Sequence, residues 1–348
     1  IGYEAGADFM VGREARTEFG EALASETADT MTMGNTIYIR ARDMGHPVPF
    51  EAPDWIHACK DDEHLPGHGN HAPHHIRHLT TPSGGWWWME CGGTEDTIRD
   101  AEKIRDELIR YAIGIWHHLK NAGEHGAENY VLESVGFVPG KRESRRLAGD
   151  HVLTQNDLEF LHRFDDVVAY TQWHIDVHNP LGVSSPEPYW VGALLKGRAD
   201  VPLRSLYSRN VENLLFAGRN ISATHVALGS TRVMGTCAVL GQAVGNAAAV
   251  CVKHQCAPRQ VLEQHLDELQ QDLLRQDCYL PFVASHDRED LAVRARVVAS
   301  SQAQLQFPPP QIYPPVESNT AQAFILSESR LRSLVLYLEN RLDKPQEV

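Results

Sequence analysis

A run of small residues in the last third of the chain restricts the fold more than any other feature. Residues 213–249 read NLLFAGRNISATHVALGSTRVMGTCAVLGQAVGNAAA. We predict a short apolar strand over 211–217, a polar loop, and then a helix from about Gly235 to near His254. Gly241 and Gly245 stand one turn apart, and without Cβ atoms they let another backbone or a flat ligand approach closely. The segment therefore predicts either a tightly packed helix or one wall of a cofactor site.

The loop before this helix favours the cofactor interpretation. The start of a helix offers unpaired N–H groups and the positive end of a dipole, which suit a carbonyl or a phosphate. The loop adds polar and basic side chains directly in front of it: Arg219, Asn220, Ser222, His225, Ser230 and Arg232.

The same helix raises the question of a membrane span. Residues 233–252 carry no formal charge and are long enough to cross a bilayer. They are rich in Gly and Ala and include Gln242 and Asn246, whereas a spanning helix is usually dominated by larger apolar residues. We therefore expect a helix buried inside a soluble protein.

Charge and cysteine usage limit the partners and the compartment. The chain has 348 residues, with 32 Lys and Arg against 46 Asp and Glu, a net charge of −14. An acidic surface disfavours nucleic acid and anionic membranes, so we expect a small-molecule substrate.

Six scattered cysteines without a C-x-x-C pair favour a reducing compartment, and we expect the cytoplasm. The opening Ile-Gly-Tyr-Glu has no initiator Met, so we expect the true N-terminus to be missing.

Hydrophobic periodicity predicts a mixed α/β (α+β) fold. The patterns indicate a β-hairpin over 36–50, strands over 130–138 and 166–178, and a helix over 94–121 that Thr94 caps. Thr154 and Asp157 predict the start of a short helix, and Pro258 predicts the start of another.

Several segments, in the same order along the chain, resemble one family of flavoproteins. They are AGADFMVGREARTEFGE near the start, GGWWWMECGG (84–93), GKRESRRLAGDHVLTQNDL (140–158), HIDVHNP (174–180) and the small-residue segment. Together they resemble the FAD-dependent oxidoreductases that are often found beside polysaccharide-degradation genes, over residues 1 to about 283. The resemblance implies FAD as the cofactor and a Rossmann-type unit whose G-x-G-x-x-G motif holds the pyrophosphate. This sequence contains no such motif, so it resembles the C-terminal two-thirds of a family member.

The resemblance also implies a division into domains. Residues 1–35 would be a remnant of the FAD-binding domain, 36–205 a substrate domain with a mixed sheet, and 206–283 the C-terminal part of the FAD-binding domain. A linker over 284–315 and a fragment of a β-sandwich module over 316–348 would follow. Because the Rossmann unit is absent, we expect this fragment alone to be inactive.

Candidate residues follow from the segments that carry the resemblance. The flavin would be held by residues of the loop and the small-residue helix: Gly218, Arg219, Asn220, Ser222, Arg232, Gly241, Gln242 and Gly245. Flavin chemistry requires a group that handles a proton, and we select His225, His178 and Asp176 as catalytic candidates. His174, Asp176 and His178 alternate, which also fits a metal site or a structural polar face.

Three other features have both functional and structural interpretations. Seven histidines lie in 57–78 with Cys59, which invites zinc although the spacing fits no closed site. The basic run Lys141, Arg142, Arg145 and Arg146 is either an anion site or a set of salt bridges to neighbours such as Glu143 and Asp150. The triplet Trp86–Trp88 either packs in the core or stacks on a flavin or sugar ring.

These features favour a flavin-dependent oxidoreductase that passes hydride between FAD and an organic, carbohydrate-derived substrate. Two alternatives remain. One is a metal-assisted lyase or hydrolase that uses His174, Asp176 and His178, and the other is a carbohydrate-binding protein without catalytic activity.

Overall fold

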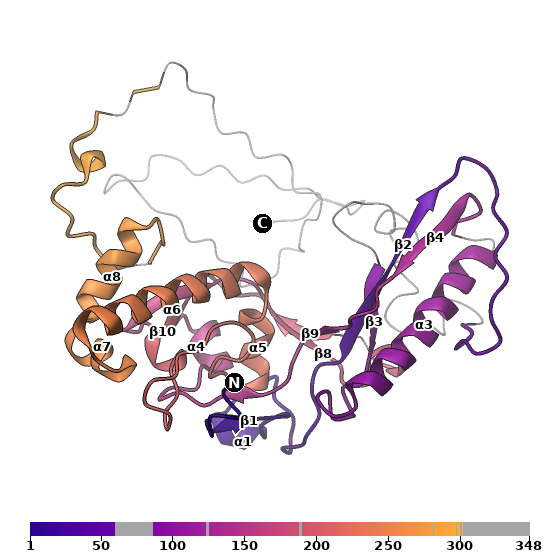
Figure 1. The fold of residues 1–348 in the computed structure, drawn as a ribbon, viewed down its shortest axis with the longest axis horizontal. Helices are drawn as coiled ribbons and strands as arrows, with labels where there is room; N and C mark the ends of the chain where they lie inside the picture. The colour runs from indigo at the N-terminus through magenta and orange to yellow at the C-terminus, as the bar shows by residue number, and fades with distance from the viewer. Residues whose placement is uncertain are drawn as a thin grey trace, which may run out of the picture. The chain divides into compact units, whose positions relative to one another are not determined.

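The computed structural model describes residues 1–59, 86–122, 125–187, 190–280, 282–296, 298–299 and 301. The chain divides into two compact units, Ile1–Glu289 and Asp290–Val348. In the second unit, the described element is the short helix η5 (Leu291–Arg294). The first unit is a mixed α/β structure with two hydrophobic cores, which confirms the predicted fold class (Figure 1).

The smaller core lies between an antiparallel sheet and one long helix. The central strand β2 (Asn35–Asp43) pairs with β3 (Trp86–Cys91), β4 (Tyr130–Val135) and β5 (Gly140–Lys141). Alternate residues of β2, including Ile37 and Ile39, are buried because strand side chains point to opposite faces in turn. They pack against the apolar stripe of α3 (Ala101–Asn121), which lies along the sheet (Figure 1).

The larger core is built from small strand pairs and from the C-terminal helices. Antiparallel pairs join β1 (Phe9–Met10) to β6 (Arg146–Leu147), β7 (Val167–Thr171) to β10 (Ala199–Pro202), and β8 (Ile175–His178) to β9 (Trp190–Ala193). Besides α3, the first unit contains the helices α1 (Arg16–Phe19), α4 (Gln155–Glu159), α5 (His225–Thr231), α6 (Met234–His254), α7 (Pro258–Gln264) and α8 (Leu266–Arg275), with the short turns η3 (Gly182–Ser184) and η4 (Leu203–Ser205).

One predicted hairpin and one predicted strand are wrong, although the first arm of the hairpin forms as β2. The hairpin over 36–50 does not form: β2 pairs instead with strands far along the chain, and 47–50 is irregular. The predicted strand over 211–217 contributes only an isolated bridge between Leu215 and Tyr207. Alternation correctly predicted the strand over 35–43 but not its partners, and the short apolar run over 211–217 was assigned to a strand that does not form.

Other elements form with different boundaries. The long helix begins at Ala101 with Asp100 at its N-cap, so Thr94 is not its cap. The strand predicted over 166–178 is two strands, β7 and β8, and the helix that begins at Pro258 breaks at His265 into α7 and α8. The predicted cap is confirmed, because Thr154 and Asp157 form a reciprocal capping box at α4.

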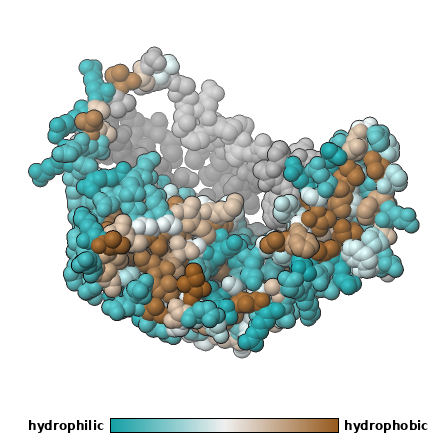
Figure 2. Space-filling view, viewed as in Figure 1, coloured by the Kyte–Doolittle hydropathy of each residue, from teal (hydrophilic) through white to brown (hydrophobic). Residues whose placement is uncertain are grey.

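Helix α6 is less buried than we expected. It spans Met234–His254, which confirms the predicted helix. By length and composition it could cross a membrane, and 28% of its most apolar 18-residue stretch is buried inside the protein. Its core-facing side carries Leu240, Ala243 and Ala247, whereas Gly241 and Gly245 face outward. The space-filling view shows pale and light-brown surface along the helix (Figure 2). The prediction of a buried helix therefore holds for one face of α6 and is wrong for its outward face.

All six cysteines are free thiols in the structure. The predicted β-sandwich fragment and half of the predicted linker lie outside the described residues. The division of 1–283 into flavin and substrate domains stays a prediction.

Candidate functional site

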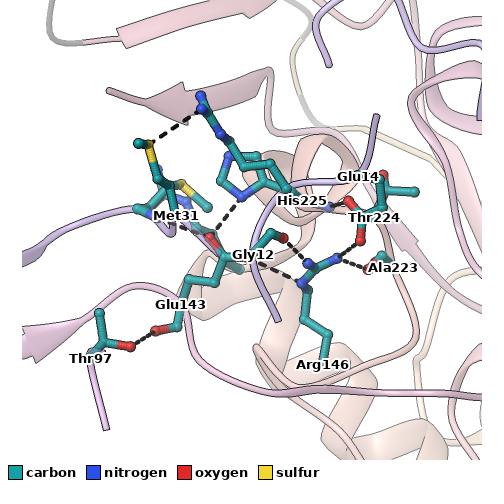
Figure 3. Close-up of polar contacts among 12 residues, drawn as sticks. Gly12, Glu14, Met31, Thr97, Glu143, Arg146, Ala223, Thr224 and His225 are labelled. Atoms are coloured by element: carbon teal, nitrogen blue, oxygen red, sulfur yellow. Dashed lines mark hydrogen bonds and ion pairs between the residues drawn. The ribbon is translucent and has the colours of Figure 1, made fainter. Parts of the chain in front are cut away.

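His225 stands at the first turn of α5 in a buried cluster of charges (Figure 3). Its Nδ1 donates a hydrogen bond to Glu143 Oε2 at 2.8 Å, and its backbone N–H donates to Glu14 Oε2 at 2.8 Å. Because a carboxylate only accepts, Nδ1 carries a hydrogen in this arrangement. Among the described residues, His225 Nε2 has no hydrogen-bond partner although it is buried.

Arg146 balances the two carboxylates of this cluster. Its side chain is completely buried, with Nη1 2.7 Å from Glu14 Oε1 and Nε 3.2 Å from Glu143 Oε1. It also donates to the carbonyl oxygens of Ala223 and Gly12 (Figure 3). Burial opposes the ionised form of Glu143, but His225 and Arg146 outweigh it and lower the pKa of Glu143. Glu143 is therefore an ionised partner for the imidazole.

The N-terminus of α5 is fixed by side chains from distant parts of the chain. Thr224 is the N-cap and accepts from the Ala227 N–H at 3.1 Å, while its hydroxyl donates to Glu21 Oε1 at 2.6 Å. Near the end of α5, the Ser230 hydroxyl donates to the Trp173 carbonyl at 2.7 Å. With both ends held, the backbone under His225 has little freedom to move.

His178, at the end of β8, belongs to a second chain of charges. Its Nδ1 donates to Glu90 Oε2 at 2.8 Å and its Nε2 to Asp176 Oδ2 at 3.2 Å. Asp176 accepts from Arg232 Nη2 at 2.9 Å, and Arg142 forms an ion pair with Glu90. Burial lowers the pKa of His178, but the bonds to Asp176 and Glu90 outweigh this effect, so the pKa is raised. Both ring nitrogens donate to carboxylates, which describes an imidazolium.

One cavity brings the two histidines together. It has a volume of about 170 Å³, and His225, His178 and Trp190 are among the residues that line it. Its wall also contains polar groups, including Arg13 and Asn179. The volume resembles that of engineered protein cavities that accept a small ring. Two of the three predicted catalytic residues therefore face one space, and Asp176 contacts His178 from behind.

The chain of charges connects this cavity to the predicted flavin helix. Arg232 is the C-cap of α5, at the start of the turn that leads to α6, and its bond to Asp176 links it to His178. Arg232 is largely buried, and its Nε lacks a partner among the described residues. The N-cap of α6, Val233, supplies no side-chain cap for the first N–H groups. The Nε–H of Arg232 and the first N–H groups of α6 are therefore available to donate to the electron-rich edge of a flavin ring.

The outward face of α6 also fits a flat group. A Cβ placed at Gly235, Gly241 or Gly245 would meet nothing within 4 Å. The glycines thus leave open space beside the backbone instead of a close contact with another segment of the described protein. The roles of Arg232, Gly241 and Gly245 in binding a flavin stay predictions.

The other predicted flavin residues lie in different surroundings. Ser222 is fully buried and its hydroxyl has no partner among the described residues, whereas Gln242 donates to the Gln276 carbonyl at 3.2 Å. Arg219 is exposed and donates to the Lys141 carbonyl, and the Asn220 carbonyl accepts from Leu147 N–H at 2.9 Å. Gly218 adopts a φ of 102°, a conformation that favours glycine. Their roles in binding a flavin stay predictions.

The metal interpretation of His174, Asp176 and His178 is not favoured. Within the described residues, these three are not among the groups whose ligand atoms lie close enough for one ion. The ring of His174 instead lies between Trp173 and Trp190, with centroid distances of 4.6 and 5.7 Å. In the histidine-rich segment, His57 contacts Glu107 at 2.6 Å, and the other six histidines lie outside the described residues.

The basic run separates into individual contacts rather than one anion site. Arg142 and Arg146 form the buried ion pairs described above, and Arg145 lies 3.9 Å from the centroid of the Tyr3 ring. The predicted salt bridge to Glu143 is confirmed, whereas Asp150 pairs with Arg259 instead. Trp86–Trp88 begin β3, and their side chains lie outside the described part of the structure.

Sequence reasoning missed the carboxylates that hold the histidines. Glu14, Glu90 and Glu143 come from three separate segments, and each is buried. A weak signal was present in RESRR, where one acid stands three residues before an arginine inside a basic run. Glu14 and Glu90 gave no comparable signal, because their partners are far away along the chain.

The mixed α/β fold, the buried histidines beside a cavity and the open glycine face of α6 together define a candidate cofactor-dependent enzyme. A family model described as FAD dependent oxidoreductase matches residues 1–273. The chain belongs to this family, and the family implies an FAD cofactor. No curated protein and no solved structure matches the chain.

Proposed function

We propose that this protein supports hydride transfer between FAD and an organic substrate, with His225 as the group that moves the proton. One observation carries the proposal: His225 borders the cavity with Nε2 unpartnered, while Glu143 holds Nδ1. A neutral imidazole whose Nδ1 donates to a carboxylate presents a lone pair at Nε2, which is the form of a general base.

His178 and Asp176 have a different part in this proposal. Both nitrogens of His178 already donate to carboxylates, so the ring is a poor acceptor for a substrate proton. Its positive charge at the cavity wall instead orients an electron-rich substrate oxygen. Asp176 is a positioning residue that holds His178 and Arg232 together.

We further propose that FAD lies against α6, near Arg232, Gly241 and Gly245. When bound, the flavin supplies a two-electron acceptor or donor for the hydride. The open face at the glycines and the buried Arg232 support this placement. The charge chain from Arg232 to His178 would connect the cofactor with the cavity.

A carbohydrate-derived substrate is the finer part of the proposal. Trp190 borders the cavity, and Trp173, His174 and Trp190 form a row of ring contacts. Aromatic faces stack on flat apolar surfaces, and sugar rings offer one beside their hydroxyls. Arg13 and Asn179 on the same wall supply polar partners for those hydroxyls.

The test compares His225→Gln with the unchanged protein. Each is expressed from the whole gene and loaded with FAD. Bleaching of the flavin absorbance is followed after mixing with a panel of aldoses and uronic acids. The variant should retain flavin, and its reduction should slow by about 10²- to 10⁴-fold, since a positioned base contributes that much.

The matched control is His162→Gln, because His162 is exposed and packs on Phe164 away from the cavity wall. It should be reduced at the unchanged rate. Equal reduction rates for His225→Gln and the unchanged protein would overturn the role of His225. A protein that binds no FAD would overturn the flavin placement as well.

A further inference from the structure

The far end of α6 carries a second cluster of metal-binding side chains. His254 is the last residue of α6, His265 lies at the junction of α7 and α8, and Glu268 lies in the first turn of α8. One ligand atom from each residue lies within 4.8 Å of the others. Among the described residues this is the group that meets the geometric requirement for a metal ion.

The backbone explains why these three residues meet. Gln255 adopts a left-handed conformation that ends α6 and turns the chain, so α7 and α8 return alongside α6. His265 and Glu268 are three residues apart, a spacing that places side chains on one helical face. Val250, Val261 and Leu269 of the three helices are buried in the same core. The ligands therefore stand on a fixed framework, as a metal site requires.

The three side chains already contact one another, and to bind one ion the two stacked rings would have to turn so that a nitrogen of each faces it. The imidazole rings of His254 and His265 stack with centroids 3.8 Å apart and planes 14° from parallel. Glu268 Oε2 accepts from His254 Nε2 at 2.7 Å, and its Oε1 accepts from Lys253 Nζ at 2.6 Å. Both oxygens of Glu268 are therefore hydrogen-bonded, and an ion bound here would replace the bond from His254.

We propose that His254, His265 and Glu268 bind a divalent transition-metal ion of the zinc class. Two imidazole nitrogens and one carboxylate oxygen suit Zn²⁺, and three protein ligands leave a coordination position for water. The set contains too few oxygen ligands to favour Ca²⁺ or Mg²⁺. The bound ion would fasten the end of α6 to the start of α8, at the end of α6 opposite Arg232.

The nearby cysteines and lysine refine this assignment. Burial and the neighbouring thiol of Cys256 raise the pKa of Cys251, so the Cys251 thiol is a poor metal ligand at neutral pH. The ammonium of Lys253 already occupies one oxygen of Glu268 and repels an incoming cation. Removing this charge should tighten zinc binding by about tenfold, because the metal and the ammonium are only a few ångströms apart.

The experiment uses the whole chain after treatment with a chelator. Zinc is titrated in, and the protein-bound zinc and the thermal midpoint are measured. Because the chain has 19 histidines, the informative quantity is the difference between variants. His265→Ala and Glu268→Gln should each bind one equivalent less than the unchanged protein and should lose most of the zinc-dependent rise in thermal midpoint. Lys253→Met should show the tighter binding.

The matched control is His286→Ala, whose histidine is exposed and lies 3.5 Å from Asp267 without belonging to the cluster. It should retain the zinc stoichiometry and the thermal shift. If both His265→Ala and Glu268→Gln bind as much zinc as the unchanged protein, the proposed site is wrong. A loss of zinc that is equal in His286→Ala would contradict it too.

Discussion

The two histidines at the cavity differ in how their rings are held. His225 has one carboxylate partner and leaves Nε2 without a partner among the described residues. His178 donates from both nitrogens, to Glu90 and to Asp176. The two rings are thus held differently, because the number of carboxylates around them differs: His178 is a cation between two carboxylates, whereas one nitrogen of His225 has no partner among the described residues.

The difference separates two roles that look alike in the sequence. Both histidines belong to segments that resemble the flavoprotein family, and either is a reasonable proton-handling group by residue type. A base needs a vacant lone pair, whereas a group that attracts a negative oxygen needs a permanent charge. From the partners of each nitrogen, we propose the first role for His225 and the second for His178.

The largest expected effect comes from breaking the charge balance around His225. Replacement of Arg146 by methionine leaves Glu14 and Glu143 buried without their cation. We expect the free energy of unfolding to fall by about 3–5 kcal/mol, the usual cost of removing one partner of a buried ion pair. Urea unfolding measures it.

The neighbouring Arg145→Met is the matched control, since Arg145 lies over the Tyr3 ring and is only partly buried. It should cost about 1 kcal/mol or less. Comparable losses in the two variants would mean that the cluster around His225 is not a tightly coupled unit.

A smaller effect should separate the carboxylates behind the two histidines. Glu143→Gln keeps the shape but removes the charge that stabilises a protonated His225, so flavin reduction should slow by about tenfold to a hundredfold. Glu90→Gln leaves His178 with Asp176 as a partner, and it should mainly raise KM with less change in kcat. The pH profile of the rate should move in Glu143→Gln, a change that a purely structural role would not produce. Identical profiles and rates in both variants would remove the distinction between the histidines.

The sequence predicted the local elements better than the site. The small-residue helix, the capping box at Thr154 and the apolar stripe of α3 were predictable because each depends on neighbours within a few residues. The hairpin over 36–50 was wrong because the pairing of β2 is decided by strands up to about a hundred residues away. Local pattern carries no information about such partners.

The site shows the same limit more clearly. The sequence selected His225, His178, Asp176 and Arg232, and the structure joins the last three in one chain of contacts. It could not show that Glu143 and Glu90 decide the state of the histidines, since Glu143 is 82 residues from His225 and Glu90 is 88 from His178. The exposed face of α6 was missed because its composition also fits a buried helix.

The smallest expected effect concerns pH and stability. The pKa of His178 is raised above its ordinary value of 6.5, so the native state binds this proton more tightly than the unfolded state. The contribution of His178 to stability is then complete below pH 6.5 and is lost as the pH rises through the native pKa. Its size is about 1.4 kcal/mol for each unit by which the native pKa exceeds 6.5. The pKa of Glu143 is lowered, so its contribution is lost in the opposite direction, on acidification.

Urea unfolding from mildly acidic to alkaline pH tests this sign. The advantage of the unchanged protein over His178→Gln should shrink as the pH rises, whereas the exposed His162→Gln should follow the unchanged protein throughout. An advantage that grows with pH would show that His178 is neutral in the folded protein. In that case His178 would resemble His225, and the number of carboxylate partners would no longer explain which histidine is the base.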